Sequence, residues 1–197
     1  MARRRRVVPV LAAAAAALAL TGATADAASR PEVVLGVGHT AAVEGDPGGG
    51  GAALGLSLLW PLEDHFRVGL MGFADDLGER AARLLGPGGV DLGPVSGVHR
   101  AARGAGWRIE GHVPSRGFLT PYFSATWGVY RMDDDVRGVT TRRVRAAGFG
   151  LGAGVLRAIN DRHSAGVAAR YHQLSRGSTE RYLTGAFEWR WGRGATE

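Results

Sequence analysis

Hydrophobic and polar residues alternate along much of residues 28–197, with a period of two residues and not the 3.6 residues of a helix. In residues 119–131 the odd positions up to Val129 are apolar, and the even positions carry hydroxyl groups or glycine. Residues 183–191 repeat this pattern, and residues 148–155 place glycine at every even position. The pattern predicts strands with one apolar face and one polar face.

Eight such segments are predicted, and the connections between them alternate in length. The predicted strands are residues 33–40, 52–60, 66–73, 106–113, 119–131, 144–157, 165–173 and 183–191. Tight turns are predicted at 61–65, 114–117 and 160–163, and longer loops at 40–51, 75–98, 132–143 and 174–179. Short turns at one end and longer loops at the other are typical of bacterial outer-membrane barrels. The sequence therefore predicts an all-β, eight-stranded antiparallel up-and-down transmembrane β-barrel, a single domain over residues 28–197.

The polar face of the predicted strands is sparse in charge, which indicates that it lines the inside of the barrel. Glycine, alanine, serine and threonine dominate it, whereas the outside of a soluble protein is dense in charge. Small residues suit a narrow eight-stranded lumen that side chains must fill. The alternative is a soluble lipocalin-like carrier, which would have the apolar face inside.

Aromatic residues gather on the apolar face, where a membrane barrel carries its interfacial girdle. The residues expected to face lipid are Trp60, Trp107, Phe123, Trp127, Phe149, Phe187, Trp189 and Trp191.

Residues 1–27 read as a cleaved signal peptide, with an uncleaved membrane anchor as the alternative. Four arginines precede an apolar run at 7–20, which is shorter than the roughly 20 residues of a spanning helix. Ala25-Asp26-Ala27 offers a cleavage site. Removing residues 1–27 takes away four arginines and Asp26, which lowers the formal net charge from +6 to +3. With no basic stripe or recognisable motif, nucleic acid is not an expected partner. The chain has no cysteine, which excludes disulfides and thiolate metal sites.

The chain resembles the small eight-stranded outer-membrane barrels similar to OmpA, OmpX and OmpW. The resemblance covers nearly the whole mature chain and is clearest in residues 119–130, 149–155, 168–173 and 183–191. It implies an outer-membrane location, contact with outer-membrane lipid or lipopolysaccharide, and insertion by the barrel assembly machinery. Barrels of this family often end on an aromatic residue, whereas Gly192–Glu197 follows Trp191 here.

Charged and aromatic side chains on the polar face predict a network that fills the lumen, because charges at membrane depth must pair or line water. The predicted members are Arg108, Glu110, His112, Tyr122, Arg170, His172, Glu188 and Arg190. We therefore expect no constitutive pore, no cofactor, and a structural or membrane-interaction role. Binding or transport of a small hydrophobic molecule is an alternative. The sequence gives no indication of the oligomeric state.

Two further kinds of chemistry are weaker in the sequence. A lipid A deacylase-like barrel needs a histidine and a serine on one face of a strand, but His172 and Ser175 are three residues apart, and His163 and Ser164 are adjacent. No catalytic residue is therefore assigned, and a non-enzymatic role is expected. The aspartates at 75–76 and 133–135 are predicted in loops, where they are expected to be solvated, with Ca²⁺ binding as the alternative.

Overall fold

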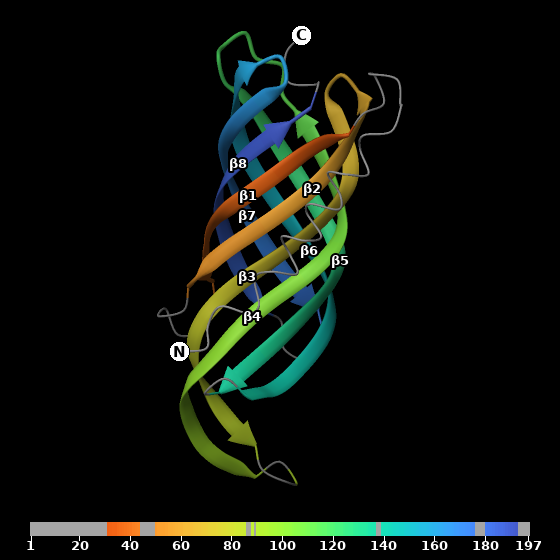
Figure 1. Cartoon of the computed structure of the whole chain (residues 1–197). Helices are drawn as coiled ribbons and strands as arrows, with labels where there is room; N and C mark the ends of the chain where they lie inside the picture. Colours follow the sequence, from red (N-terminus) through yellow and green to blue (C-terminus); the bar gives the residue numbers. More distant parts are fainter. Residues whose placement is uncertain are drawn as a thin grey trace.

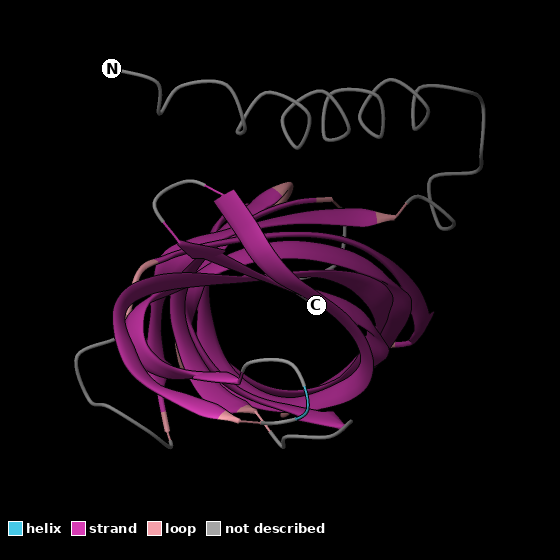
Figure 2. Ribbon diagram, turned by 90° about the horizontal axis from the view of Figure 1, so that it is seen from below, coloured by secondary structure: helices cyan, strands magenta, loops and turns pink. Residues whose placement is uncertain are grey.

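The computed structural model describes residues 31–43, 50–85, 88, 90–136, 139–175 and 180–192, and it forms a closed antiparallel barrel. The predicted signal peptide lies outside the described residues. Each strand pairs with the next along the chain, and β1 pairs with β8, so that the ring closes (Figures 1 and 2). The strands are β1 (Glu32–Ala42), β2 (Ala52–Glu63), β3 (Phe66–Leu85), β4 (Asp91–His112), β5 (Thr120–Val136), β6 (Val139–Asn160), β7 (His163–Ser175) and β8 (Arg181–Trp191). The described residues contain no helix that is long and apolar enough to be a candidate membrane span.

The alternating pattern of the sequence is realised as an inside and an outside. In β5, Tyr122 and Ser124 are buried in the barrel, while Phe123 and Trp127 between and beyond them are exposed on its outer surface. The same alternation of burial appears in β8, where Tyr182 and Thr184 are buried and Leu183 and Phe187 are exposed. The predicted fold class, eight antiparallel strands in a ring, is confirmed.

The three connections predicted as tight turns all lie at one end of the barrel, at the top of Figure 1, but the β4–β5 connection is longer than predicted, with seven residues, 113–119. The β2–β3 turn has two residues, 64–65, and so does the β6–β7 turn, 161–162. The side-chain oxygen of Asn160 accepts hydrogen bonds from the backbone N–H groups of Arg162 and His163, each at 3.0 Å. This local arrangement stabilises the β6–β7 turn. The first residue of β1 and the last of β8 lie at the same end.

Two of the predicted loops are wrong. Most of residues 75–98 belongs to β3 and β4, and most of residues 132–143 belongs to β5 and β6. The β3–β4 hairpin extends past the rest of the barrel, at the bottom of Figure 1. Alternation marks a strand only where its two faces meet different surroundings, and register shifts after Asp76 and after Arg80 interrupt the pattern further. The Asp133–Asp135 run therefore lies within a strand and not at a loop tip.

A row of glycines in β6 makes room for the large side chains of β5 inside the barrel. A Cβ added at Gly154 would lie 2.5 Å from the Tyr122 ring, and one added at Gly148 would lie 2.6 Å from the Tyr130 ring. Both glycines are cross-strand partners of β5 residues, Tyr122 opposite Gly154 and Gly128 opposite Gly148. Because the inward face of this stretch of β6 carries only glycines, the β5 tyrosines can extend into the lumen.

We expect Gly154→Ala to destabilise the folded barrel by about 1–3 kcal/mol, because the added methyl group overpacks the Tyr122 ring. The measurement is urea-induced unfolding of the refolded protein in detergent. Gly55→Ala is the matched control, because Gly55 also points inward and has nothing within 4 Å of the added Cβ. Equal stability of the two variants would show that the glycine row does not set the packing of the lumen.

Candidate functional site

Glu188 lies at the centre of a buried ion-pair network inside the barrel. One of its oxygens accepts hydrogen bonds from Arg108 Nη2 and Arg170 Nη2, each at 2.9 Å. The other accepts from Arg190 Nη2 at 2.6 Å and from the Tyr122 hydroxyl at 2.7 Å. These four partners come from β4, β5, β7 and β8. A single carboxylate thus connects both sides of the lumen.

Glu110 forms the second centre of the same network. Arg190 contacts it with both terminal nitrogens, Nη1 at 2.7 Å and Nη2 at 3.2 Å, in the fork geometry that favours arginine–carboxylate pairs. Arg108 also forms an ion pair with Glu110. His112 Nε2 lies 3.3 Å from a Glu110 oxygen. Because Arg108 and Arg190 each contact both carboxylates, the two centres form one continuous network.

The structure brings together seven of the eight residues that the sequence predicts on the lumenal face. Arg108, Glu110, His112, Tyr122, Arg170, Glu188 and Arg190 are joined by the contacts above. His172 also points inward and is buried, but it belongs to a separate aromatic layer.

Sequence reasoning missed several lumenal residues, among them a buried ion pair between β1 and β3. Arg67 Nε lies 3.1 Å from Glu32 Oε2, and Arg190 extends the network toward Glu32 at 3.9 Å. Counting Arg67 and Glu32, four arginines and three glutamates lie in this layer. Extending the alternation of β3 from Val68 and Leu70 would have placed Arg67 inside. Apolar Met71 on the same inward face hid that signal.

An aromatic layer lies inside the barrel next to Glu188, on the side toward the β3–β4 hairpin. The His172 ring stacks on the Tyr182 ring, with centroids 4.5 Å apart and an interplanar angle of 7°. The Tyr182 hydroxyl donates a hydrogen bond to Asp75 at 2.9 Å, and the Tyr130 hydroxyl lies 3.2 Å from His172 Nδ1. Tyr130 and Tyr182 also belong to a buried apolar cluster, whose other members are Leu77, Ala102, Met132, Ala146 and Leu174.

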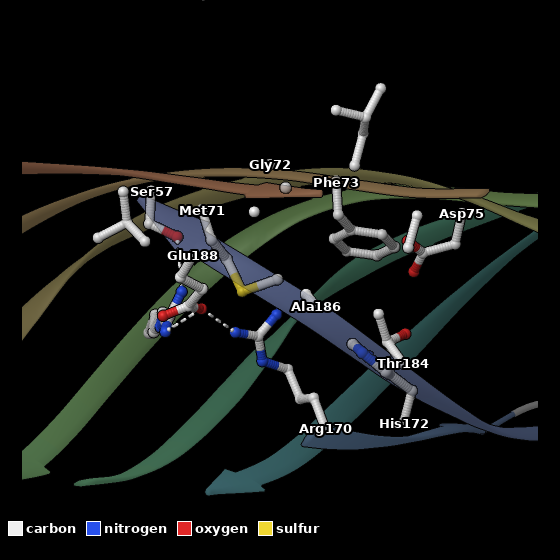
Figure 3. A pocket seen from close by; sticks show the side chains of 16 residues that line it. Ser57, Met71, Gly72, Phe73, Asp75, Arg170, His172, Thr184, Ala186 and Glu188 are labelled. Carbon is white, nitrogen blue, oxygen red and sulfur yellow. Dashed lines mark hydrogen bonds and ion pairs between the residues drawn. The ribbon is translucent and has the colours of Figure 1, made fainter. Parts of the chain in front are cut away.

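A small cavity separates the ion-pair network from the aromatic layer (Figure 3). Arg170 reaches across one side of it to Glu188, while Asp75, His172 and Thr184 line the other side. Its volume is about 20 Å³. This is enough for about one water molecule.

A third group of charges lies farther along the lumen, toward the β3–β4 hairpin. Arg100 contacts both oxygens of Asp134, at 2.6 Å and 2.9 Å, and forms an ion pair with Glu180. On the outer surface Asp133 accepts hydrogen bonds from Arg131 and Arg143. These aspartates are bound by arginines, so the alternative of a Ca²⁺ site finds no support. No cluster of three or more potential metal ligands occurs among the residues that the structure describes.

The residues considered for a deacylase-like site lie on different faces. His172 is buried in the lumen, whereas Ser175 is exposed and donates a hydrogen bond to the carbonyl oxygen of Ala147 at 3.1 Å. Ser164 is buried, and the neighbouring His163 contacts Asn160 at the turn. Neither pair has the geometry of a base beside a nucleophile.

The predicted aromatic girdle lies on the outer surface. Trp60, Trp107, Phe123, Trp127, Phe149 and Phe187 are exposed, and Trp189 and Trp191 are half-buried against each other with ring centroids 6.3 Å apart. These side chains form a broad apolar exterior together with exposed Leu151, Val129 and Val167.

The geometry agrees with that of known outer-membrane barrels. Neisserial surface protein A superposes with a TM-score of 0.61 at 13% identity, over 84% of this chain and 97% of that one. The N-terminal β-barrel domain of Pseudomonas aeruginosa OprF gives a TM-score of 0.51 at 13% identity, over 83% and 99% of the two chains. The outer-membrane enzyme PagL also matches, with a TM-score of 0.40 at 17% identity over 81% and 97%.

The chain thus has the fold of the small eight-stranded outer-membrane β-barrels, as its resemblance to the OmpA and OmpX type implies. The amino-acid sequence matches no protein-family model and no curated protein.

Glu188→Gln should destabilise the barrel by about 3–5 kcal/mol, because it leaves three buried arginines around a neutral side chain. The measurement is again unfolding of the refolded protein by urea. Glu63→Gln, at an exposed position at the end of β2, is the control and should change stability little. A loss below 1 kcal/mol for Glu188→Gln would mean that the network contributes little to holding the lumen together.

Proposed function

We propose that this protein is an integral outer-membrane barrel whose interior is plugged and whose role is structural, exerted through contacts with the surrounding membrane. The observation that carries the proposal is the distribution of charge. Glu110, Glu188 and Arg190 are nearly inaccessible inside, while the outside presents Phe123, Val129 and Leu151, each more than half exposed. Water disfavours such an exterior, whereas hydrocarbon tolerates it.

The interior argues against a soluble lipocalin-like carrier. Such a carrier needs an apolar pocket inside the barrel, but the lumen holds ion pairs around Glu110 and Glu188, and its cavity is about 20 Å³. The same filling leaves no room for a small hydrophobic ligand within the barrel. A ligand of that kind would have to bind on the outer surface.

The length of the apolar band on β6 fits a bilayer. Its outward positions run from Ala147 to Val155 and are bracketed by exposed Arg145 and Arg157. At ~3.4 Å per residue the two arginines are about 40 Å apart along the strand. With a strand tilt of ~35–45° they lie about 30 Å apart along the membrane normal, enough to enclose an apolar band of ~25 Å.

The two ends of the barrel suggest its orientation. Outer-membrane barrels carry short turns on the periplasmic side and longer connections outside. The end with the β2–β3 and β6–β7 turns is therefore assigned to the periplasm, and the long β3–β4 hairpin to the cell exterior. The proposal includes an exported precursor, insertion by the barrel assembly machinery and contact with outer-membrane lipid. It also includes a non-enzymatic role, which the separation of His172 and Ser175 supports.

Leu151→Arg tests which solvent the outer surface meets. Leu151 lies midway between Arg145 and Arg157, so a charge there should cost about 2–4 kcal/mol in a lipid bilayer. Val139→Arg, at an exposed position at the start of β6, is the control and should change stability by less than 1 kcal/mol. The measurement is reversible unfolding in phospholipid vesicles. In a soluble barrel both substitutions would be tolerated equally, and that outcome would contradict the proposal.

Vesicles containing the full chain should show no steady conductance above that of empty vesicles, because Glu188, Arg108 and Arg190 close the lumen.

In the same preparation the protein should migrate on SDS gels at a different position before and after boiling, as folded barrels do. Lipid A incubated with the protein should keep its mass. A steady single-channel current would remove the plug from the proposal, and loss of an acyl chain would remove the non-enzymatic role.

A further inference from the structure

Three arginines on neighbouring strands form a row on the outer surface, just beyond the apolar band. Arg103 of β4 is the cross-strand partner of Arg131 of β5, and Arg131 is the partner of Arg145 of β6. The outward residues next to them toward the membrane centre, Ala105, Val129 and Ala147, are apolar. On three successive strands, therefore, the apolar surface ends in an arginine at the same level.

Like charges directly opposite each other destabilise a sheet, so this row needs a source of negative charge. Asp133 supplies one: it accepts hydrogen bonds from Arg131 Nε and Arg143 Nε, each at 3.1 Å. Arg103 and Arg145 are exposed, and no ion pair or hydrogen bond of their side chains is found within the described part of the chain. Four arginines and one aspartate leave a formal charge of +3 on this patch.

The guanidinium groups of the row and their position at the edge of the apolar band together indicate the kind of ligand that the row binds. The planar guanidinium group binds phosphate with two parallel hydrogen bonds, and a spacing of ~4.8 Å between strands spreads the three groups over about 10 Å. The row lies where the apolar band gives way to headgroups, at the end assigned to the cell exterior. We propose that Arg103, Arg131 and Arg145 bind the phosphate groups of a phosphorylated glycolipid in the outer leaflet. This inference rests on the proposed function, because it requires the apolar band to lie in the membrane.

The test is binding of bisphosphorylated lipid A to the folded full chain in a neutral detergent, measured by native mass spectrometry. The double variant R103Q/R145Q should weaken binding roughly tenfold or more, because it removes two cationic contacts. Arg157→Gln is the matched control: Arg157 lies on the outward face of β6 beyond the opposite edge of the band, and its substitution should leave binding unchanged. Equal losses for the two variants would overturn the proposal.

A second variant should change binding in the opposite direction. Asp133→Asn removes the only carboxylate that contacts Arg131 and Arg143 among the residues that the structure describes, so lipid A should bind several-fold more tightly to it than to the unmodified protein. Unchanged or weaker binding would contradict the assignment of the arginine row as the phosphate site.

Two further arms identify the source of the phosphate. Lipid A without phosphate groups should bind no better to the unmodified protein than to R103Q/R145Q. Inorganic phosphate at the same concentration should not compete, because it lacks the acyl chains that lie along the apolar band. Effective competition by inorganic phosphate would reduce the site to a free-anion site and overturn the lipid assignment. Failure of the Leu151→Arg test would remove the membrane placement itself, whereas failure of the arginine variants with that test passed would remove only this inference.

Discussion

The pairing of β1 with β8 is the contact on which the rest of the structure depends. It runs from Val33 opposite Trp191 to Ala42 opposite Tyr182, and it leaves the barrel without a free sheet edge along that length. An open edge would present unpaired N–H and C=O groups, which hydrocarbon cannot satisfy. Closure therefore makes an apolar exterior compatible with a membrane, and it also fixes a narrow interior that only side chains can fill.

The narrow interior explains why charge and glycine occur together on the same faces. The lumen must hold Arg108, Arg170 and Arg190 close enough to share Glu188, and large β5 side chains need the empty space above the β6 glycines. Buried charges of this kind are costly unless every one is paired. In this network each glutamate contacts more than one arginine, which offsets much of that cost. The same packing fills the layer around Glu188 with side chains.

The types of residue on the outer surface of the barrel change along its length. Apolar and aromatic side chains cover the middle, and arginines appear at the edges of this band, with Arg157 at one level and Arg145 at the other. Beyond the band, β3 to β6 continue as a polar extension, in which Arg100 and Asp134 are paired inside and Arg131 and Asp133 outside. The apolar band, the arginines at its edges and the extension of β3 to β6 therefore follow one another along the barrel axis.

The amino-acid sequence by itself determined the strand number, the antiparallel ring and the two faces of each strand. It could do so because every spanning strand has one side toward the lumen and one toward the exterior, which forces a period of two. That is why Arg108, Glu110, Glu188 and Arg190 could be placed on the inner face without a structure.

Only the tertiary structure decided the partners. Glu32 and Arg67 form a pair because β1 and β3 flank β2 in the ring and both side chains point inward. The row of Arg103, Arg131 and Arg145 exists only through the register of three strands. The extended hairpins also escaped the sequence, because charged residues lie on both faces of β5 there, with Asp134 inside and Asp133 outside, so that hydropathy does not alternate along the strand. Register is a property of a pair of strands, so it cannot be read from the sequence of either strand alone.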